Sequence, residues 1–281
     1  MLDAVSVASH RAAVNGVELH YVEAGSGPLV VLAHGFPEFW YSWRKQIPPL
    51  VAAGFHVVAL DLRGYNESSK PEGVESYKLT SVAADIVALI EHLGAPCVLV
   101  GHDWGGFASW IVAMTRPDVI RKLAILNIPH PAPFAREMRR HFSQKLRMAY
   151  QLYFQPPGLP ELTMRPIFRR VLRRGGRFTR EDIDEYDKAW SKPGATRAMA
   201  NYYRAIRRYR SELRPLIKPI EKPVLLIWGE REPVFRRSTT EDFDEWVPNL
   251  RIARIAGAGH FVQTDEPEIV SDLLIEFASG P

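Results

Sequence analysis

The stretch that decides the fold of this chain is Gly101-His102-Asp103-Trp104-Gly105. It stands between an apolar segment with a strand pattern and an apolar segment with a helix pattern. Residues 97–101 are apolar throughout, as in a strand buried on both faces of a parallel sheet, and residues 107–114 suit a helix. A sharp strand-to-helix turn crowds its own neighbours, so small glycines flank it and its central residue projects at the carboxyl edge of the sheet. This stretch therefore predicts a turn that presents the Asp103 carboxylate as a nucleophile.

Strands and helices alternate on both sides of this turn. Asn15-Gly16 predicts an N-terminal hairpin, because both residues tolerate a positive φ. A helical apolar spacing runs from Val82 to Leu93, and Gly94 supplies a stop. Such alternation implies right-handed crossovers, so we expect an α/β fold with a mostly parallel, doubly wound sheet. Its strand-like runs are residues 29–34, 57–61, 97–101, 123–127, 224–228 and 251–256.

The alternation is interrupted in the middle of the chain. Residues 131–216 are helical in pattern, with a capping-box sequence from Thr179 to Asp182 and a break at Pro156-Pro157-Gly158. We therefore expect a discontinuous core, residues 1–130 and 217–281, with an all-helical cap, residues 131–216, inserted into it.

Composition fits a globular enzyme, with 46% hydrophobic and 24% charged residues among 281. The net charge of +4 is uneven, because residues 131–216 hold 20 Lys and Arg against 8 Asp and Glu. These arginines are spread over several expected helices rather than grouped beside exposed aromatics, so we expect a solvated surface and no nucleic-acid partner.

The apolar runs are too short for a membrane span. A single cysteine, Cys97, which we expect to be buried, and the absence of a signal-peptide pattern indicate a cytoplasmic location.

An aspartate at the centre of the turn restricts the reaction. A carboxylate that attacks forms an alkyl ester, so the electrophile is a saturated carbon with a leaving group rather than an acyl carbonyl. An esterase would need serine or cysteine there. The alternative is that Asp103 only caps the helix that follows it.

Two further motifs favour the nucleophile. His34-Gly35-Phe36-Pro37 follows the first core strand, and the backbone N–H of Phe36 can join that of Trp104 in an oxyanion hole. The Phe36-Pro37 bond can be cis. Gly259-His260-Phe261 follows the last strand, where His260 can act as the general base toward water.

Two carboxylates, Glu230 and Glu232, follow the strand-like run 224–228, and either of them can orient His260. A carboxylate bound to the histidine fixes its tautomer and stabilises the imidazolium. We predict Glu232 for this role, with Glu230 as the alternative.

The chain resembles the epoxide hydrolases of the α/β-hydrolase fold, of the soluble type without the extra N-terminal phosphatase domain. The resemblance runs over nearly the whole chain. It implies that Asp103 attacks and that two cap tyrosines, Tyr150 and Tyr203, donate hydrogen bonds to the epoxide oxygen. The segments that carry it are residues 32–44, 61–65, 101–106 and 258–263.

Some residues depart from the family pattern or compete with it. Glu232 stands where the family usually has aspartate, which predicts a less well oriented histidine and slower ester hydrolysis. Tyr202 cannot share a helical face with its neighbour Tyr203, so we interpret it as packing. Tyr153 can share the face of Tyr150, and only the resemblance separates that pair.

We therefore expect an enzyme that converts epoxides into vicinal diols through an Asp103 ester, which His260-activated water hydrolyses. Phe36, Trp104 and Phe261 are expected to line the substrate site, which favours an apolar or aromatic epoxide. No fingerprint for a cofactor or a metal is present. The alternatives are a haloalkane dehalogenase, for which Trp104 is a candidate halide donor, and a ligand-binding protein that lost turnover.

Overall fold

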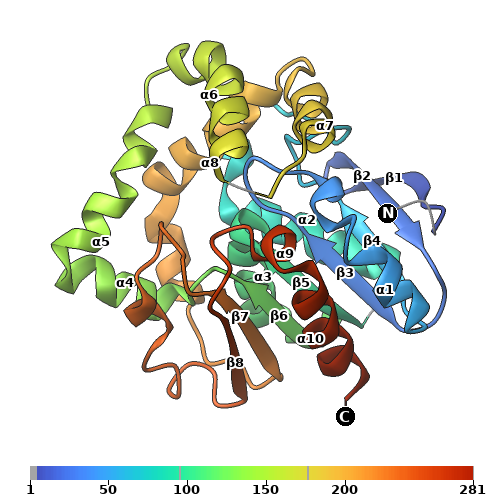
Figure 1. The fold of residues 1–281 in the computed structure, drawn as a ribbon. Helices are drawn as coiled ribbons and strands as arrows, with labels where there is room; N and C mark the ends of the chain where they lie inside the picture. The colour runs from blue at the N-terminus through green and yellow to red at the C-terminus, as the bar shows by residue number, and fades with distance from the viewer. Residues whose placement is uncertain (1–4, 95, 176, 281) are drawn as a thin grey trace.

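The computed structural model describes residues 5–94, 96–175 and 177–280, and its centre is a sheet of eight strands in the order β1-β2-β4-β3-β5-β6-β7-β8 (Figure 1). β2 runs antiparallel to both β1 and β4, and all other neighbouring strands are parallel. The strands are β1 Ala8–Val14, β2 Val17–Ala24, β3 Leu29–Ala33, β4 His56–Leu60, β5 Cys97–His102, β6 Ile120–Leu126, β7 Val224–Gly229 and β8 Leu250–Ile255.

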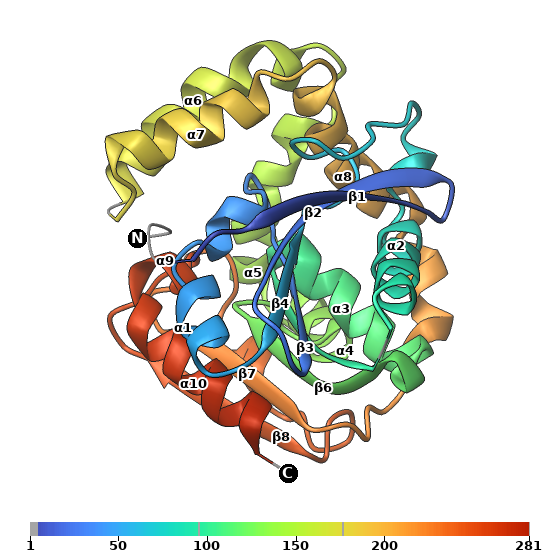
Figure 2. The ribbon, with the colours of Figure 1, turned by 90° about the vertical axis from the view of Figure 1, so that its right-hand side faces the viewer.

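Helices cover both faces of the sheet (Figure 2). α2 and α3 pack on one face, and α1, α9 and α10 lie on the other, so the central strands β3 and β5 are buried throughout. This burial is why their sequences are continuously apolar rather than alternating. The helices are α1 Ile47–Ala52, α2 Leu79–His92, α3 Asp103–Thr115, α9 Val262–Asp265 and α10 Pro267–Ser279, with short 3-10 turns at Trp40–Trp43, Glu75–Tyr77, Pro117–Val119 and Arg237–Thr240.

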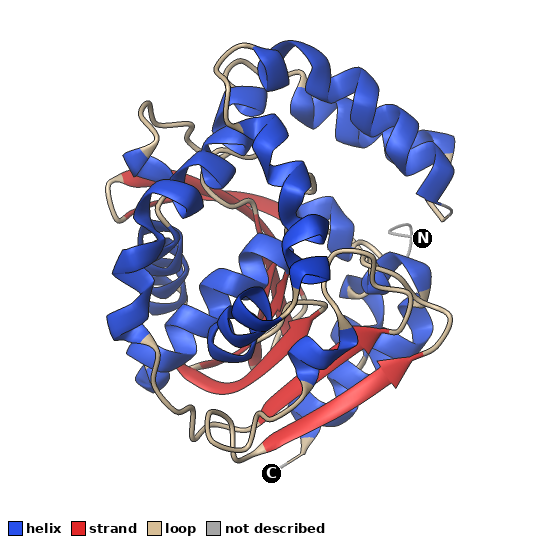
Figure 3. Ribbon diagram, turned by 90° about the vertical axis from the view of Figure 1, so that its left-hand side faces the viewer, coloured by secondary structure: helices blue, strands red, loops and turns tan. Residues whose placement is uncertain are grey.

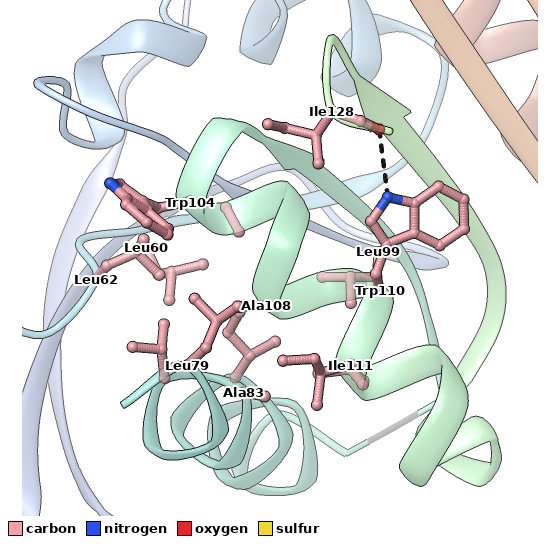
Figure 4. Packing of buried hydrophobic residues seen from close by; sticks show 14 of the residues in the cluster. Leu60, Leu62, Leu79, Ala83, Leu99, Trp104, Ala108, Trp110, Ile111 and Ile128 are labelled. Atoms are coloured by element: carbon pink, nitrogen blue, oxygen red, sulfur yellow. Dashed lines mark hydrogen bonds between the residues drawn. The ribbon is translucent and has the colours of Figure 1, made fainter. Parts of the chain in front are cut away.

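The contact between α2 and α3 anchors the helix that carries Asp103. Ala83 of α2 and Ala108 of α3 are small, which lets the two helices approach closely beside Leu99 of β5 (Figure 4). Trp110 is fully buried, and its indole N–H donates to the backbone oxygen of Ile128, 3.3 Å away. This packing fixes α3 against the sheet.

Between β6 and β7 the chain forms only helices (Figure 3). The expected capping box is present, because the Thr179 hydroxyl accepts from the Asp182 N–H and the Asp182 carboxylate accepts from the Thr179 N–H. Among the described residues, no helix is both long and apolar enough to cross a bilayer. These inserted helices are α4 Pro131–Arg140, α5 Phe142–Arg147, η5 Met148–Phe154, α6 Leu159–Gly175, α7 Arg180–Trp190, α8 Ala195–Tyr209 and η6 Arg210–Leu216.

The elements agree with the sequence-based expectations except at some of their ends. The hairpin turns at Asn15 and Gly16, with φ of 47° and 73°, and Cys97 is fully buried. β6 begins at Ile120, three residues earlier than expected, because Arg121 interrupts its apolar run. α3 begins at Asp103 itself and not near residue 107.

Replacing Leu99 with alanine should lower the free energy of unfolding by about 2–5 kcal/mol, because it opens a cavity between β5 and the helices that cover it. Leu162→Ala is the matched control: Leu162 is 82% exposed, so its loss should change the free energy by less than about 0.5 kcal/mol. Urea unfolding of the two variants measures both values. Equal losses would contradict the packing described for β5.

Candidate active site

Asp103 stands at the sharp turn from β5 into α3. Its backbone has a φ of 47°, which residues other than glycine seldom adopt. Close contacts of the neighbouring glycines hold it there. A Cβ on Gly105 would lie 2.3 Å from the Ala33 oxygen, and one on Gly101 would lie 2.6 Å from the Ser109 hydroxyl. The flanking glycines are therefore required by space, as the sequence predicts for this turn.

The loop after β3 brings a backbone donor to Asp103. A Cβ on Gly35 would lie 2.2 Å from the Cβ of Asp103, so only glycine allows the loop to come this near. The Phe36 N–H donates to Asp103 Oδ1 at 2.7 Å, and the Phe36-Pro37 bond is cis. His34 fixes the loop through Nδ1, which donates to the Gly35 oxygen, and Nε2, which accepts from the Leu62 N–H.

The two oxygens of Asp103 have different neighbours. Oδ1 faces the Phe36 N–H, whereas Oδ2 lies 3.7 Å from Nε2 of His260, on the loop between β8 and α9. Burial acts to raise the pKa of Asp103, but His260 and the Phe36 N–H outweigh it, so the pKa lies below its ordinary value. The carboxylate is therefore ionised and has one oxygen free to react.

His260 lies between two carboxylates. Its Nδ1 lies 2.7 Å from Oε2 of Glu232, which follows β7, and its Nε2 faces Asp103. Burial lowers the pKa of His260, but the charges of Glu232 and Asp103 outweigh it and hold the pKa well above its ordinary value. With both carboxylates charged, the imidazole is protonated.

Glu232, and not Glu230, contacts the histidine. The Glu232 carboxylate is fully buried and also accepts from the Asn127 amide at 2.6 Å and from the Val234 N–H at 2.7 Å. Burial raises its pKa, but His260 and these donors outweigh it, so the pKa lies below its ordinary value. Glu230 points elsewhere and pairs with Arg254 at 3.0 Å. The extra methylene of glutamate therefore does not prevent contact with His260.

Several residues around the site were not predicted from the sequence. Asn127 follows β6 with a φ of 50°, and its side-chain amide donates both to the Glu232 carboxylate and to the Gly259 oxygen. Both ring nitrogens of His102 face acceptor oxygens: Nδ1 lies 2.8 Å from a Glu38 carboxylate oxygen, and Nε2 lies 2.9 Å from the backbone oxygen of His260. The position of Asn127 at the carboxyl edge of the sheet is the only signal that pointed to it.

The inserted helices bring two tyrosine rings near this site. Tyr203 of α8 packs against Trp104 and Phe36, with ring centroids 5.1 and 5.0 Å apart, and the Tyr150 ring lies 5.9 Å from that of Tyr203. Burial, together with the Asp103 charge, raises the pKa of both hydroxyls, so both stay protonated at neutral pH.

The two competing tyrosines have other partners. The Tyr153 hydroxyl lies 2.7 Å from the Thr163 hydroxyl, and the Tyr202 hydroxyl donates to the Arg63 oxygen at 2.8 Å. Both hydroxyls are thereby occupied within the protein. The choice between Tyr150 and Tyr153, which helical spacing leaves open, favours Tyr150.

A cavity of about 1640 Å³ leads from Asp103 toward the surface between α4, η5 and η6. Trp104 and Tyr150 line it, but Phe36 and Phe261 are not among its lining residues. Phe261 instead packs edge-on against Phe178, 5.3 Å between centroids. Within the described part of the chain, no group of three or more His, Cys, Asp or Glu residues could hold a metal ion.

Comparisons with known proteins agree with this fold. Residues 28–267 match the family described as alpha/beta hydrolase fold. The chain is 39% identical to the AB hydrolase superfamily protein YfhM of Bacillus subtilis, over 94% of this chain and 95% of that protein. It is 38% identical to epoxide hydrolase 4 of Mus musculus, over 94% of this chain and 77% of that protein.

Solved structures are similar over the same length. A product complex of an epoxide hydrolase variant from Bacillus megaterium has a TM-score of 0.89 at 35% identity and covers 96% of this chain and 100% of its own. Epoxide hydrolase A from Mycobacterium thermoresistibile has a TM-score of 0.86 at 33% identity, over 98% and 99% of the two chains. The chain belongs to the epoxide hydrolases of the α/β-hydrolase fold family.

The two carboxylates beside His260 should have a measurable effect on the pKa of its imidazole. Nuclear magnetic resonance of histidine-labelled protein should show a His260 pKa above the ordinary value, and Glu232→Gln should lower that pKa by about 1 to 3, because it removes a charge in direct contact. Glu230→Gln is the matched control and should leave the pKa unchanged, since Glu230 contacts Arg254 instead. An equal response of His260 to both variants would contradict the geometry.

Proposed function

We propose that this protein converts epoxides into vicinal diols through a hydroxyalkyl ester on Asp103. The observation that carries the proposal is the unequal environment of the Asp103 carboxylate. Asp103 lines the cavity; its Oδ1 accepts from the Phe36 N–H, whereas its Oδ2 faces Nε2 of His260. One oxygen is thus placed to attack and the other to take up charge later.

In the first step Oδ2 of Asp103 attacks a carbon of the epoxide, and the ring C–O bond breaks. The electron pair goes to the ring oxygen, which takes a proton from Tyr150 or Tyr203. An alkoxide is a much stronger base than a phenolate, so a phenol that stays protonated at neutral pH is a suitable donor.

Ester formation also changes the charge around His260. It removes the negative charge of Asp103, one of the two charges that raise the pKa of His260. The pKa therefore falls, His260 releases its proton, and this proton replaces the one that the tyrosine gave. A neutral base is then present only after the ester has formed.

In the second step His260 takes a proton from water, and the water oxygen attacks Cγ of the ester. The charge develops on Oδ1, where the Phe36 N–H lies, and the Trp104 N–H in the first turn of α3 is the second proposed donor. Collapse of this intermediate breaks the bond between Cγ and the substrate oxygen, which takes the proton from the His260 imidazolium and leaves as the diol. The carboxyl group of Asp103 then returns a proton to His260, which restores the starting charges. Glu232 acts as a positioning residue that holds His260 in place.

We assign residues 131–216 to a cap that completes the substrate site, and residues 1–130 and 217–281 to the core. An apolar or aryl-bearing epoxide suits a cavity with Trp104, Phe107 and Phe134 on its walls. In line with this, the Bacillus megaterium structure holds a naphthyloxy propanediol as its product. The role of Phe36 and Phe261 as substrate contacts and the cytoplasmic location stay predictions from the sequence.

Haloalkane dehalogenation is the second candidate. The observation that favours it is the indole N–H of Trp104, which is buried and has no hydrogen-bond partner among the described residues. Such a donor beside the nucleophile suits a departing halide. The two tyrosine hydroxyls favour the epoxide, because its oxygen leaves as an alkoxide that needs a proton.

Turnover of styrene oxide tests the proposal. The wild type should form phenylethanediol over many turnovers, and Tyr150→Phe and Tyr203→Phe should each lower the rate of ester formation by about 10- to 1000-fold, the usual effect of removing a general acid. Tyr153→Phe is the matched control, because its hydroxyl bonds Thr163, and it should keep most of the activity. Halide release from a bromoalkane, with no diol formed from styrene oxide, would move the assignment to a dehalogenase.

A further inference from the structure

Exposed apolar side chains gather on one stretch of the chain. Of the nine large hydrophobic residues that are exposed among the described residues, eight lie between residues 142 and 171. We call the part formed by α5, η5 and α6 the outer face. It carries Phe142, Leu146 and Leu152, which are 76%, 65% and 60% exposed, and Leu159, Leu162, Ile167 and Val171, of which Leu162 is 82% exposed.

The same stretch is strongly basic. Residues 138–175 contain nine Lys and Arg and one acidic residue, Glu161. Glu161 is paired with Arg204 on the inner side of α6. The exposed positions of α6 are apolar from Leu159 to Ile167 and mostly cationic beyond it, where Arg170, Arg173 and Arg174 lie beside Val171. No ion pair among the described residues involves these three arginines.

Part of the outer face borders the cavity that reaches Asp103. In Figure 1, α5 and α6 follow one another along the outer edge of the molecule, away from β1 and α1. The lining of the cavity includes Arg139 and Arg140 of α4, together with Lys145 of α5 and Leu152 of η5, which belong to the outer face.

We propose that the outer face docks on an anionic lipid surface, with its leucine, isoleucine and phenylalanine side chains in the interfacial layer. Helices with an apolar stripe flanked by Lys and Arg bind such surfaces by burying the stripe while the cations meet anionic headgroups. This orientation brings the part of the cavity lined by Lys145 and Leu152 near the layer in which apolar epoxides dissolve. Lipid binding itself does not depend on the reaction proposed above.

Charge argues against other occupants. In a symmetric dimer the same patch meets itself, so the arginines of one copy would face those of the other. A nucleic acid would neutralise the arginines but leave the aliphatic side chains in water, because stacking uses aromatic rings. A bilayer with anionic headgroups satisfies both kinds of side chain.

Sedimentation of the full chain with vesicles tests the proposal. The protein should bind vesicles of equal parts phosphatidylcholine and phosphatidylglycerol at least about tenfold more tightly than pure phosphatidylcholine, since each cation near the surface contributes about fivefold. High salt should remove most of this difference. Equal binding to the two kinds of vesicle, or none to either, would overturn the proposal.

Two charge variants locate the contact. Leu162→Glu combined with Ile167→Glu should weaken binding to the anionic vesicles at least about tenfold, because it places anions in the stripe. Ile269→Glu is the matched control: Ile269 is 46% exposed on α10, far from the outer face in Figure 1, and binding should not change. Circular dichroism checks that both variants fold. A dimer in light scattering that the double variant dissociates would assign the face to a second copy instead.

Discussion

The hydrogen bond from the Phe36 N–H to Asp103 Oδ1 requires two segments of the chain to lie very close together. They lie so close that a side chain at Gly35 would not fit between them. The loop after β3 passes the turn between β5 and α3 at a distance that excludes a Cβ on Gly35. β3 and β5 are hydrogen-bonded neighbours in the sheet, so their carboxyl ends meet at one edge. The parallel sheet thus brings together the proposed oxyanion donor and the proposed nucleophile.

The remaining groups of the site come from farther along the same edge. Asn127 follows β6, Glu232 follows β7 and His260 follows β8, and hydrogen bonds join the three. In the proposed mechanism, the charges of Glu232 and Asp103 keep His260 protonated while Asp103 is free, and esterification of Asp103 lets His260 lose its proton. Electrostatics then sets the order of the two proposed steps.

Features of the fold and the site can be predicted from the sequence where they depend on neighbouring residues. Features that depend on residues far apart in the chain cannot. The turn at Asp103 and the loop at Gly35 are local patterns with strict steric demands, so single residues indicate them. The choice of Glu232 over Glu230 depends on where the loop after β7 points, and the partner of Tyr153 is Thr163 of another helix. Asn127 was missed because its role exists only once three strands are side by side.

The formation of an ester on Asp103 is the central claim, and mass spectrometry of the His260→Gln variant mixed with styrene oxide tests it most directly. Without its base the variant should accumulate the ester, so the peptide that contains Asp103 should gain the full mass of styrene oxide. The double variant with Asp103→Asn should gain nothing. An unmodified Asp103 peptide in the folded His260→Gln variant, or a label on another residue, would contradict the account.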